Sequence, residues 1–175
     1  KSFETKEEAT KAFEKGYEHY LKTASSSKAA AGLTPKAPVG KPIWESLCVD
    51  AACSGNPGDM EYRGVYPPTM QEIFRIGPLK KGTNNIGEFL ALVHGLALLK
   101  QKGSSLPIYS DSRNAIGWVK KKKCKTLLER VPENEPIFDM IERAEKWLKT
   151  NTYTTPILKW ETSEWGEIPA DFGRK

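Results

Sequence analysis

The sequence has 175 residues, with 27 Lys and Arg, 22 Asp and Glu, and a net charge of +5. Hydrophobic residues make up 38% of it, which together with 14 glycines excludes a largely disordered or collagen-like chain. Residues 1–41 hold eight Lys and five Glu, a net of +3, whereas residues 42–175 hold 19 basic and 17 acidic residues, a net of +2. The basic excess favours a polyanionic partner, although the main body is nearly neutral.

The cysteine pattern and the hydropathy pattern exclude two further classes of protein. There are three cysteines, an odd number, and none forms a CxxC pair, so neither a disulfide framework nor a structural zinc site is expected. This usage fits a cytoplasmic location. The longest apolar run, residues 89–99, contains a His and a Gly and is far shorter than the roughly 20 residues of a membrane span. We therefore expect no membrane association.

The first 41 residues read as an appendage of the main body. A helix is predicted over residues 5–21, because Thr5 and Glu8 have the spacing of a capping box. Apolar residues then recur at helical spacing, at Ala9, Phe13, Tyr17 and Tyr20. Residues 22–41 are rich in Ala, Ser, Gly, Pro and Lys, which predicts a flexible linker.

The main body, residues 42–175, alternates between strand and helix patterns. Strands are predicted at 43–53, 62–66, 72–76, 106–110 and 156–160, and helices at 85–100, 112–120 and 135–149. The first three strands follow one another directly, which indicates an antiparallel meander. Strands and helices then alternate, so we predict an α/β domain with a mixed sheet.

Four carboxylates stand at positions where function and ordinary structure compete. Asp50 lies in a buried strand, where it could instead bond into the next turn. Glu88 could close a capping box with Asn85, and Asp111 could cap the following helix. Asp171 could be a solvated residue of the tail. Taken singly, these residues leave the choice open.

The sequences around the four carboxylates decide it. DAACSGNPG at 50–58, GTNNIGEFLA at 82–91, YSDSRNAIGW at 109–118 and WGEIPAD at 165–171 occur in this order. The set resembles the type 1 ribonuclease H family, closest to the bacterial enzymes that carry an N-terminal hybrid-binding domain. The resemblance covers about residues 42–175 and implies a five-stranded mixed sheet, an antiparallel meander followed by parallel strands, flanked by helices. Residues 1–21 resemble the final helix of the hybrid-binding domain, which would otherwise be mostly absent.

The resemblance implies hydrolysis of the RNA strand of RNA–DNA hybrids, with 5′-phosphate and 3′-hydroxyl products. Two Mg²⁺ ions, which Mn²⁺ could replace, would be held by Asp50, Glu88, Asp111 and Asp171. Asp50 would contact both ions, and Asp111 and Asp171 the ion of the attacking water. Glu88 would bind the leaving-group ion and a ribose 2′-hydroxyl. The loop before Asp171 contains no His, and Glu167 is expected to take its auxiliary catalytic role.

The same resemblance implies a set of substrate contacts. The RNA strand would be read by Cys53, Gly55, Asn56 and Asn84, and a DNA phosphate would be bound by Thr83, Asn85 and Thr126. Trp118 would pack on a DNA sugar, unless it is a core residue, and Arg113 and Thr162 complete the set. Residues 120–125 hold five lysines, which are expected to contact phosphates rather than only to solvate a helix end.

Two alternative functions remain open at this stage: a non-catalytic module that binds hybrids, and a DNA-cutting nuclease or transposase core on the same fold. The complete acidic set argues against the module, since unused buried carboxylates would repel one another. The sequence GTNN at 82–85, which by resemblance reads 2′-hydroxyls, argues against the DNA-cutting enzyme. We expect a monomer without an obligate protein partner.

Overall fold

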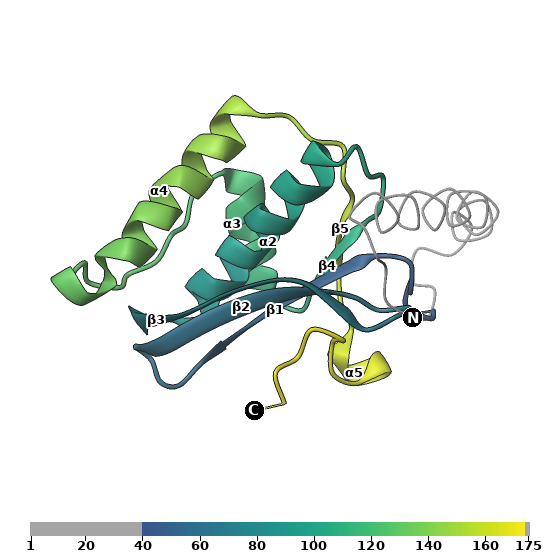
Figure 1. Ribbon diagram of the computed structural model, residues 1–175, viewed down its shortest axis with the longest axis horizontal. Coiled ribbons are helices and arrows are strands. Elements are labelled where there is room, and N and C mark those ends of the chain that lie inside the picture. The colour runs from purple at the N-terminus through teal and green to yellow at the C-terminus, as the bar shows by residue number, and fades with distance from the viewer. Residues whose placement is uncertain (1–39, 174–175) are drawn as a thin grey trace.

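The computed structural model describes residues 40–173 (Figure 1). The predicted helix at 5–21 and the linker up to residue 39 lie outside the described residues. The described elements, in chain order, are β1 (Leu47–Cys53), β2 (Gly58–Tyr66), β3 (Gln71–Gly82), α2 (Asn84–Gln101), β4 (Ile108–Ser110), α3 (Arg113–Lys121), η1 (Pro132–Asn134), α4 (Glu135–Thr150), β5 (Ile157–Lys159) and α5 (Thr162–Trp165).

The five strands form one mixed sheet in the order β3-β2-β1-β4-β5. β1 pairs with β2, and β2 with β3, in antiparallel fashion, whereas β4 lies parallel to both β1 and β5. The predicted meander followed by parallel strands is therefore confirmed. In the β1–β2 register, Asp50 lies opposite Arg63.

The two faces of the sheet are covered by different parts of the chain. Helices α2, α3 and α4 lie on one face, and α5 with the C-terminal segment lies on the other (Figure 1). Alternating residues of β1 follow this division: Val49 and Ala51 belong to the core beneath the helices, and Cys48 belongs to a smaller cluster with Trp160 and Ile168. Asp50 lies two residues after Cys48 on β1, so it lies on the same face of the sheet as Cys48.

Helix α2 lies very close to β1, and Gly87 is the reason. A Cβ atom at this position would lie 2.7 Å from the Cβ atom of Ala51, which is shorter than real contacts allow. A glycine is therefore required here for the helix to approach the strand. The approach brings the next residue, Glu88, against the backbone of β1.

Several predicted bounds were wrong. β2 and β3 are longer than expected, because their pairing continues past Gly77-Pro78 through register shifts and places Gly58 opposite Gly82. β1 starts at Leu47 rather than at residue 43, since Ser46 Oγ donates to the carbonyl of Ile43 and bends the chain before the strand. The loop after β5 contains the short helix α5, which was not predicted.

Within residues 40–173, none of the helices has the length and apolar character that a membrane crossing requires.

Candidate active site

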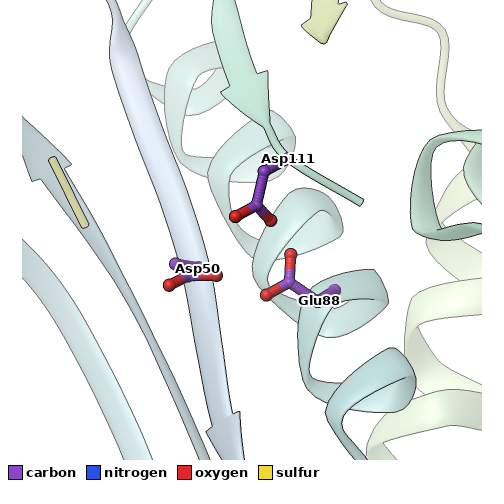
Figure 2. A group of neighbouring side chains, drawn as sticks. All are labelled: Asp50, Glu88 and Asp111. Atoms are coloured by element: carbon purple, nitrogen blue, oxygen red, sulfur yellow. The ribbon is translucent and has the colours of Figure 1, made fainter. Parts of the chain in front are cut away.

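Three of the four predicted carboxylates meet at one point where β1, the end of β4 and the first turns of α2 come together. Asp50 comes from the middle of β1, Glu88 from the second turn of α2, and Asp111 from the residue after β4 (Figure 2). One carboxylate oxygen of each residue lies within 4.8 Å of the others. Asp50 is 0% exposed and Glu88 is 1% exposed, so two of the three charges are buried.

Glu88 is held by two hydrogen bonds from other elements. The main-chain N–H of Ala51 donates to Oε1 at 2.7 Å, and Ser110 Oγ donates to Oε2 at 3.3 Å. Burial raises the pKa of Glu88 well above its usual value, and a hydrogen bond with Asp50 and the charges of Asp50 and Asp111 raise it further. The side chain is thus fixed toward the other two acids.

The structural alternatives for Glu88 and Asp111 are wrong. Helix α2 is capped by Thr83, whose hydroxyl accepts from the N–H of Ile86, and Glu88 points to β1 instead of closing a capping box with Asn85. Helix α3 is capped by Ser112, not by Asp111. Local sequence spacing suggested that Glu88 and Asp111 take part in capping. Because Thr83 and Ser112 cap the two helices instead, both carboxylates are available to bind a ligand.

The group of three carboxylates fits a divalent cation. Three carboxylate oxygens within 4.8 Å of one another repel when ionised, and a bound cation would offset that repulsion. Carboxylate oxygens are also the ligands that Mg²⁺ prefers in proteins. Asp50, Glu88 and Asp111 are therefore close enough together to hold a metal ion between them.

Asp171 lies outside this group of three. It follows Ala170 in the C-terminal segment, where its Oδ2 accepts from the N–H of Gly173 at 2.9 Å. Its main-chain carbonyl accepts from Arg63 Nη2 at 2.7 Å. Glu167 is exposed just after α5. The metal-ligand role of Asp171 and the auxiliary role of Glu167 stay predictions.

A groove of about 700 Å³ opens between the end of β1 and the start of α2. It contains six of the predicted substrate-binding residues, and its lining consists of Ala52, Cys53, Ser54, Gly55, Asn56, Thr83, Asn84 and Asn85. The turn that forms one wall is compact, because Ser54 Oγ accepts from the N–H of Asp59 at 2.8 Å. A Cβ atom at Gly58 would lie 2.5 Å from the nitrogen of Gly55, so only glycine fits there.

A second pocket, of about 410 Å³, adjoins the first and shares Asn56, Thr83 and Asn85 with it. Its remaining lining residues are Pro57, Trp118, Lys125, Thr126, Leu127 and Leu128. The three residues predicted to bind a DNA phosphate are therefore brought together. Trp118 is half-buried and also contacts Phe89, so its pocket and core positions coexist.

The remaining predicted contacts lie elsewhere. Arg113 is exposed at the first residue of α3, and Thr162 is the first residue of α5; neither lines the two pockets. Of the lysine run, the first two residues end α3, and Lys122 turns the chain with a φ of 60°. Of the described lysines of the run, only Lys125 lines one of these two pockets.

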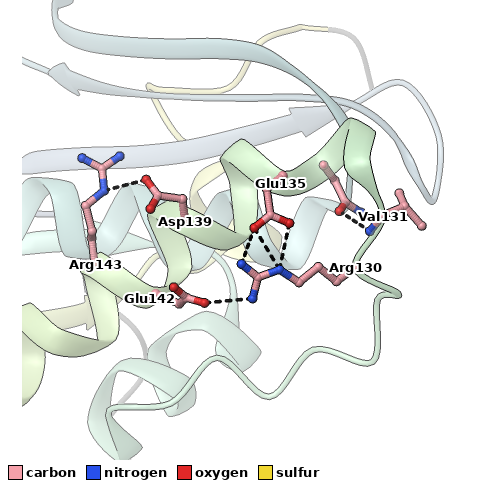
Figure 3. A network of polar contacts seen from close by, with 7 residues as sticks. Arg130, Val131, Glu135, Asp139, Glu142 and Arg143 are labelled. Carbon is pink, nitrogen blue, oxygen red and sulfur yellow. Dashed lines mark hydrogen bonds and ion pairs between the residues drawn. The ribbon is translucent and has the colours of Figure 1, made fainter.

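Sequence reasoning missed Asn134, which connects the end of β3 to the segment that follows Leu128, next to two parts of the chain that line the second pocket. Its side chain donates to the carbonyls of Lys81 and Glu129 at 3.2 and 2.9 Å and accepts from the N–H of Val131. Arg130, in the same loop, pairs with Glu135 and Glu142 of α4 (Figure 3). An Asn before a helix reads as a cap, so no local signal pointed to this role.

A family model described as RNase H matches residues 45–159. The chain belongs to the RNase H family. The matched region includes Asp50, Glu88 and Asp111 but ends before Asp171. The type 1 resemblance drawn from the four motifs is thereby confirmed at the level of the family.

Curated relatives carry the same family name. A ribonuclease H of Rhodopirellula baltica is 41% identical over 75 residues, 42% of this chain and 46% of that protein. One of Rickettsia bellii is 31% identical over 137 residues, 71% of this chain and 83% of that protein. The alignments thus span less than half of one relative and most of another. Among solved structures, RNase H1 of Halobacterium salinarum has a TM-score of 0.43 at 19% identity, covering 68% of this chain and 86% of that chain.

Proposed function

We propose that this RNase H family member hydrolyses the RNA strand of RNA–DNA hybrids. The observation that carries the proposal is the continuity of the acidic site with the groove. Asp50 is followed on β1 by Ala52 and Cys53, and Glu88 is preceded on α2 by Asn84 and Asn85, all of which line the groove. A strand bound there would run directly toward the carboxylates.

The reaction we infer is in-line hydrolysis that leaves 5′-phosphate and 3′-hydroxyl ends. Asp50, Glu88 and Asp111, with Asp171 as a fourth ligand, would hold two Mg²⁺ ions, or Mn²⁺ in their place. Bound there, the ions would activate the attacking water and stabilise the leaving 3′ oxygen. The side chains themselves form no covalent intermediate in this scheme.

The protein's own contribution is a fixed arrangement of ligands. Glu88 is held at both oxygens by Ala51 and Ser110, so its orientation is set before any ligand binds. Asp50 is fully buried in the sheet. We assign Glu167, an exposed carboxylate four residues before Asp171, to auxiliary proton movement or product release.

The groove of about 700 Å³ is the inferred site of the RNA strand. An RNA-containing duplex presents its 2′-hydroxyls in a wide, shallow minor groove. The exposed turn at Gly55 and Asn56 has little side-chain bulk, and Asn84 and Asn85 add amide groups that can donate to and accept from ribose oxygens.

The second pocket is the inferred site of a DNA phosphate. Thr83, Asn85 and Thr126 supply hydroxyl and amide donors, and Lys125 supplies a positive charge. The start of α2 also favours an anion, because the first N–H groups of a helix lack intrahelical partners. Trp118 in the same pocket would pack against the adjacent sugar.

We further propose that the enzyme acts as a cytoplasmic monomer without an obligate protein partner. The three cysteines are free thiols, which suits a reducing compartment. Gel filtration with light scattering, at the protein concentration used for cleavage, tests the oligomeric state directly.

The test of the proposed function is product analysis with matched substrates. RNA–DNA hybrid, double-stranded RNA and double-stranded DNA of one sequence are incubated with the protein and Mg²⁺. We expect cleavage of the RNA strand of the hybrid alone, with 5′-phosphate ends, and none with Asp111→Asn. Equal cleavage of double-stranded DNA would contradict the proposal in favour of a DNA-cutting enzyme. Tight hybrid binding without cleavage would instead indicate a non-catalytic module.

A further inference from the structure

The segment that carries Asp171 lies outside the strands and helices and covers the sheet face opposite α2 (Figure 1). Its local structure is limited: the N–H of Asp171 donates to the carbonyl of Ile168 at 2.8 Å, and Gly173 donates back to the Asp171 carboxylate. Ala170 and Ile168 are buried in the smaller core cluster. These contacts anchor the segment to the sheet without specifying its position along β2.

Arg63 supplies that position. Its Nε donates to the carbonyl of Ala170 at 2.8 Å, and its Nη2 donates to the carbonyl of Asp171 at 2.7 Å. A guanidinium presents its donors in a rigid fork, so two bonds to consecutive carbonyls fix both distance and orientation. Arg63 also lies opposite Asp50 in the β1–β2 register. One side chain thus links the segment of Asp171 to the strand beside Asp50.

Phe172, the residue after Asp171, adds a second contact with Arg63. We call the contacts of Arg63, Arg75 and Phe172 the clamp. The ring centroid of Phe172 lies 4.9 Å from the guanidinium carbon of Arg63 and 5.2 Å from that of Arg75, so two cations contact one ring. Both arginines are oriented by acids: Glu72 contacts Arg63 at 3.8 Å and Arg75 at 2.6 Å, and Glu61 contacts Arg75 at 3.1 Å. These contacts connect β2, β3 and the C-terminal segment.

We propose that Arg63 is a positioning residue for Asp171, and that Arg75 and Phe172 support it. The inference rests on the proposed function, in which Asp171 is the fourth metal ligand. Asp171 is not part of the group of three carboxylates, so its approach to a bound ion depends on the segment that carries it. Arg63 holds that segment in register with Asp50. Without the clamp, the fourth ligand would be lost while the other three stay in place.

The experiment compares Arg63→Gln with Arg143→Gln in the full chain. Arg143 is an exposed arginine of α4 whose ion pair with Asp139 lies away from the clamp, so it controls for loss of one charge. Mn²⁺ binding is measured by electron paramagnetic resonance, and kcat and KM are measured on the hybrid. For Arg63→Gln we expect about tenfold weaker Mn²⁺ binding and a lower kcat at unchanged KM, in line with other residues that support metal ligands. Arg143→Gln should match the wild type.

A double-mutant cycle separates positioning from general destabilisation. If Arg63 acts through Asp171, adding Arg63→Gln to Asp171→Asn costs no further Mn²⁺ affinity or kcat. Arg63→Lys should recover little, because one ammonium cannot reproduce the fork. If Arg63→Gln does not fold, Phe172→Leu, which removes only the ring between the cations, should weaken Mn²⁺ binding in the same direction.

The outcomes distinguish the two proposals. Asp171→Asn that binds Mn²⁺ and cleaves hybrid like the wild type would overturn the four-ligand part of the proposed function. If Asp171→Asn lowers Mn²⁺ binding and cleavage but the clamp variants lower neither, the positioning role of Arg63 is overturned and the four-ligand proposal stands. Effects of Arg63→Gln that add in full to those of Asp171→Asn would also contradict it.

Discussion

The N–H of Ala51 donates a 2.7 Å hydrogen bond to Glu88 Oε1 and ties the acidic residue of α2 to the strand that carries Asp50. This bond stabilises the ionised carboxylate, whereas burial and the charges of Asp50 and Asp111 oppose ionisation. In the metal-free protein the ionised carboxylates repel one another and destabilise the fold. The free energy of unfolding should therefore change with mutation of these acids and with pH.

Glu88→Gln should stabilise the metal-free protein at pH 8 and abolish activity. The folded-state pKa of Glu88 is raised, so its contribution to stability is present at low pH and is lost as pH rises through that pKa. Removing the charge should raise the free energy of unfolding, by roughly 1 kcal/mol or more. Urea titrations in EDTA at pH 5 and pH 8 check this, and a gain that does not grow with pH would contradict it.

The same variant should lose hybrid cleavage by more than about 100-fold, because even residues that only support a metal ligand cost 10- to 100-fold when removed. The matched control is Glu142→Gln, which removes an exposed carboxylate of α4 that pairs with Arg130. Initial rates at saturating Mg²⁺ measure the effect. Cleavage by Glu88→Gln within tenfold of the wild type would show that Glu88 is not a metal ligand.

Lys125→Gln should weaken hybrid binding at every sequence tested and lower the salt dependence. One phosphate contact contributes a slope of about −0.9 to the plot of log affinity against log salt concentration, so the slope should fall by about one. Lys125 lines the second pocket, whereas the control Lys149→Gln changes an exposed lysine in the last turn of α4. Fluorescence anisotropy between 50 and 200 mM salt measures both. Equal slopes for the two variants would remove Lys125 from the phosphate site.

Cys53 should be the first cysteine to react with iodoacetamide at pH 8. Burial raises the pKa of the Cys48 and Cys124 thiols to about 12, so their reactive thiolates are scarce. Cys53 is half-buried and lines the groove. Peptide mass spectrometry after brief labelling shows the order in which the three cysteines are alkylated. A hybrid bound in Ca²⁺ should slow the labelling of Cys53, and labelling that is unaffected by hybrid would place the RNA strand elsewhere.

Asn134→Ala should lower the free energy of unfolding by about 2 kcal/mol, because it removes three hydrogen bonds from a residue that is 1% exposed. Asn134 ties Lys81, two residues before Thr83, to the loop that follows Thr126. The KM for hybrid should therefore rise more than kcat falls. Thermal melts and steady-state kinetics check the two effects. A variant with an unchanged KM would mean that the loop does not shape the phosphate pocket.

The sequence by itself determined the kind of elements and the identity of the acidic set. Hydrophobic periodicity depends on local geometry, so it predicted the helix around Glu88 and the strand around Asp50, and the order of four motifs predicted the family and the mixed sheet. Local spacing alone could not choose between capping and catalysis for Glu88 or Asp111, because both interpretations use the same positions.

Only the tertiary structure decided which groups meet. Glu88 is bonded to a backbone N–H 37 residues away, and Arg63 to carbonyls more than 100 residues away. Such contacts depend on strand register and on how closely a helix approaches a sheet, which Gly87 sets here. Neither quantity is encoded in local periodicity. The sequence therefore named the four carboxylates, and the fold brought three of them together and left Asp171 in a segment that is bonded to Arg63.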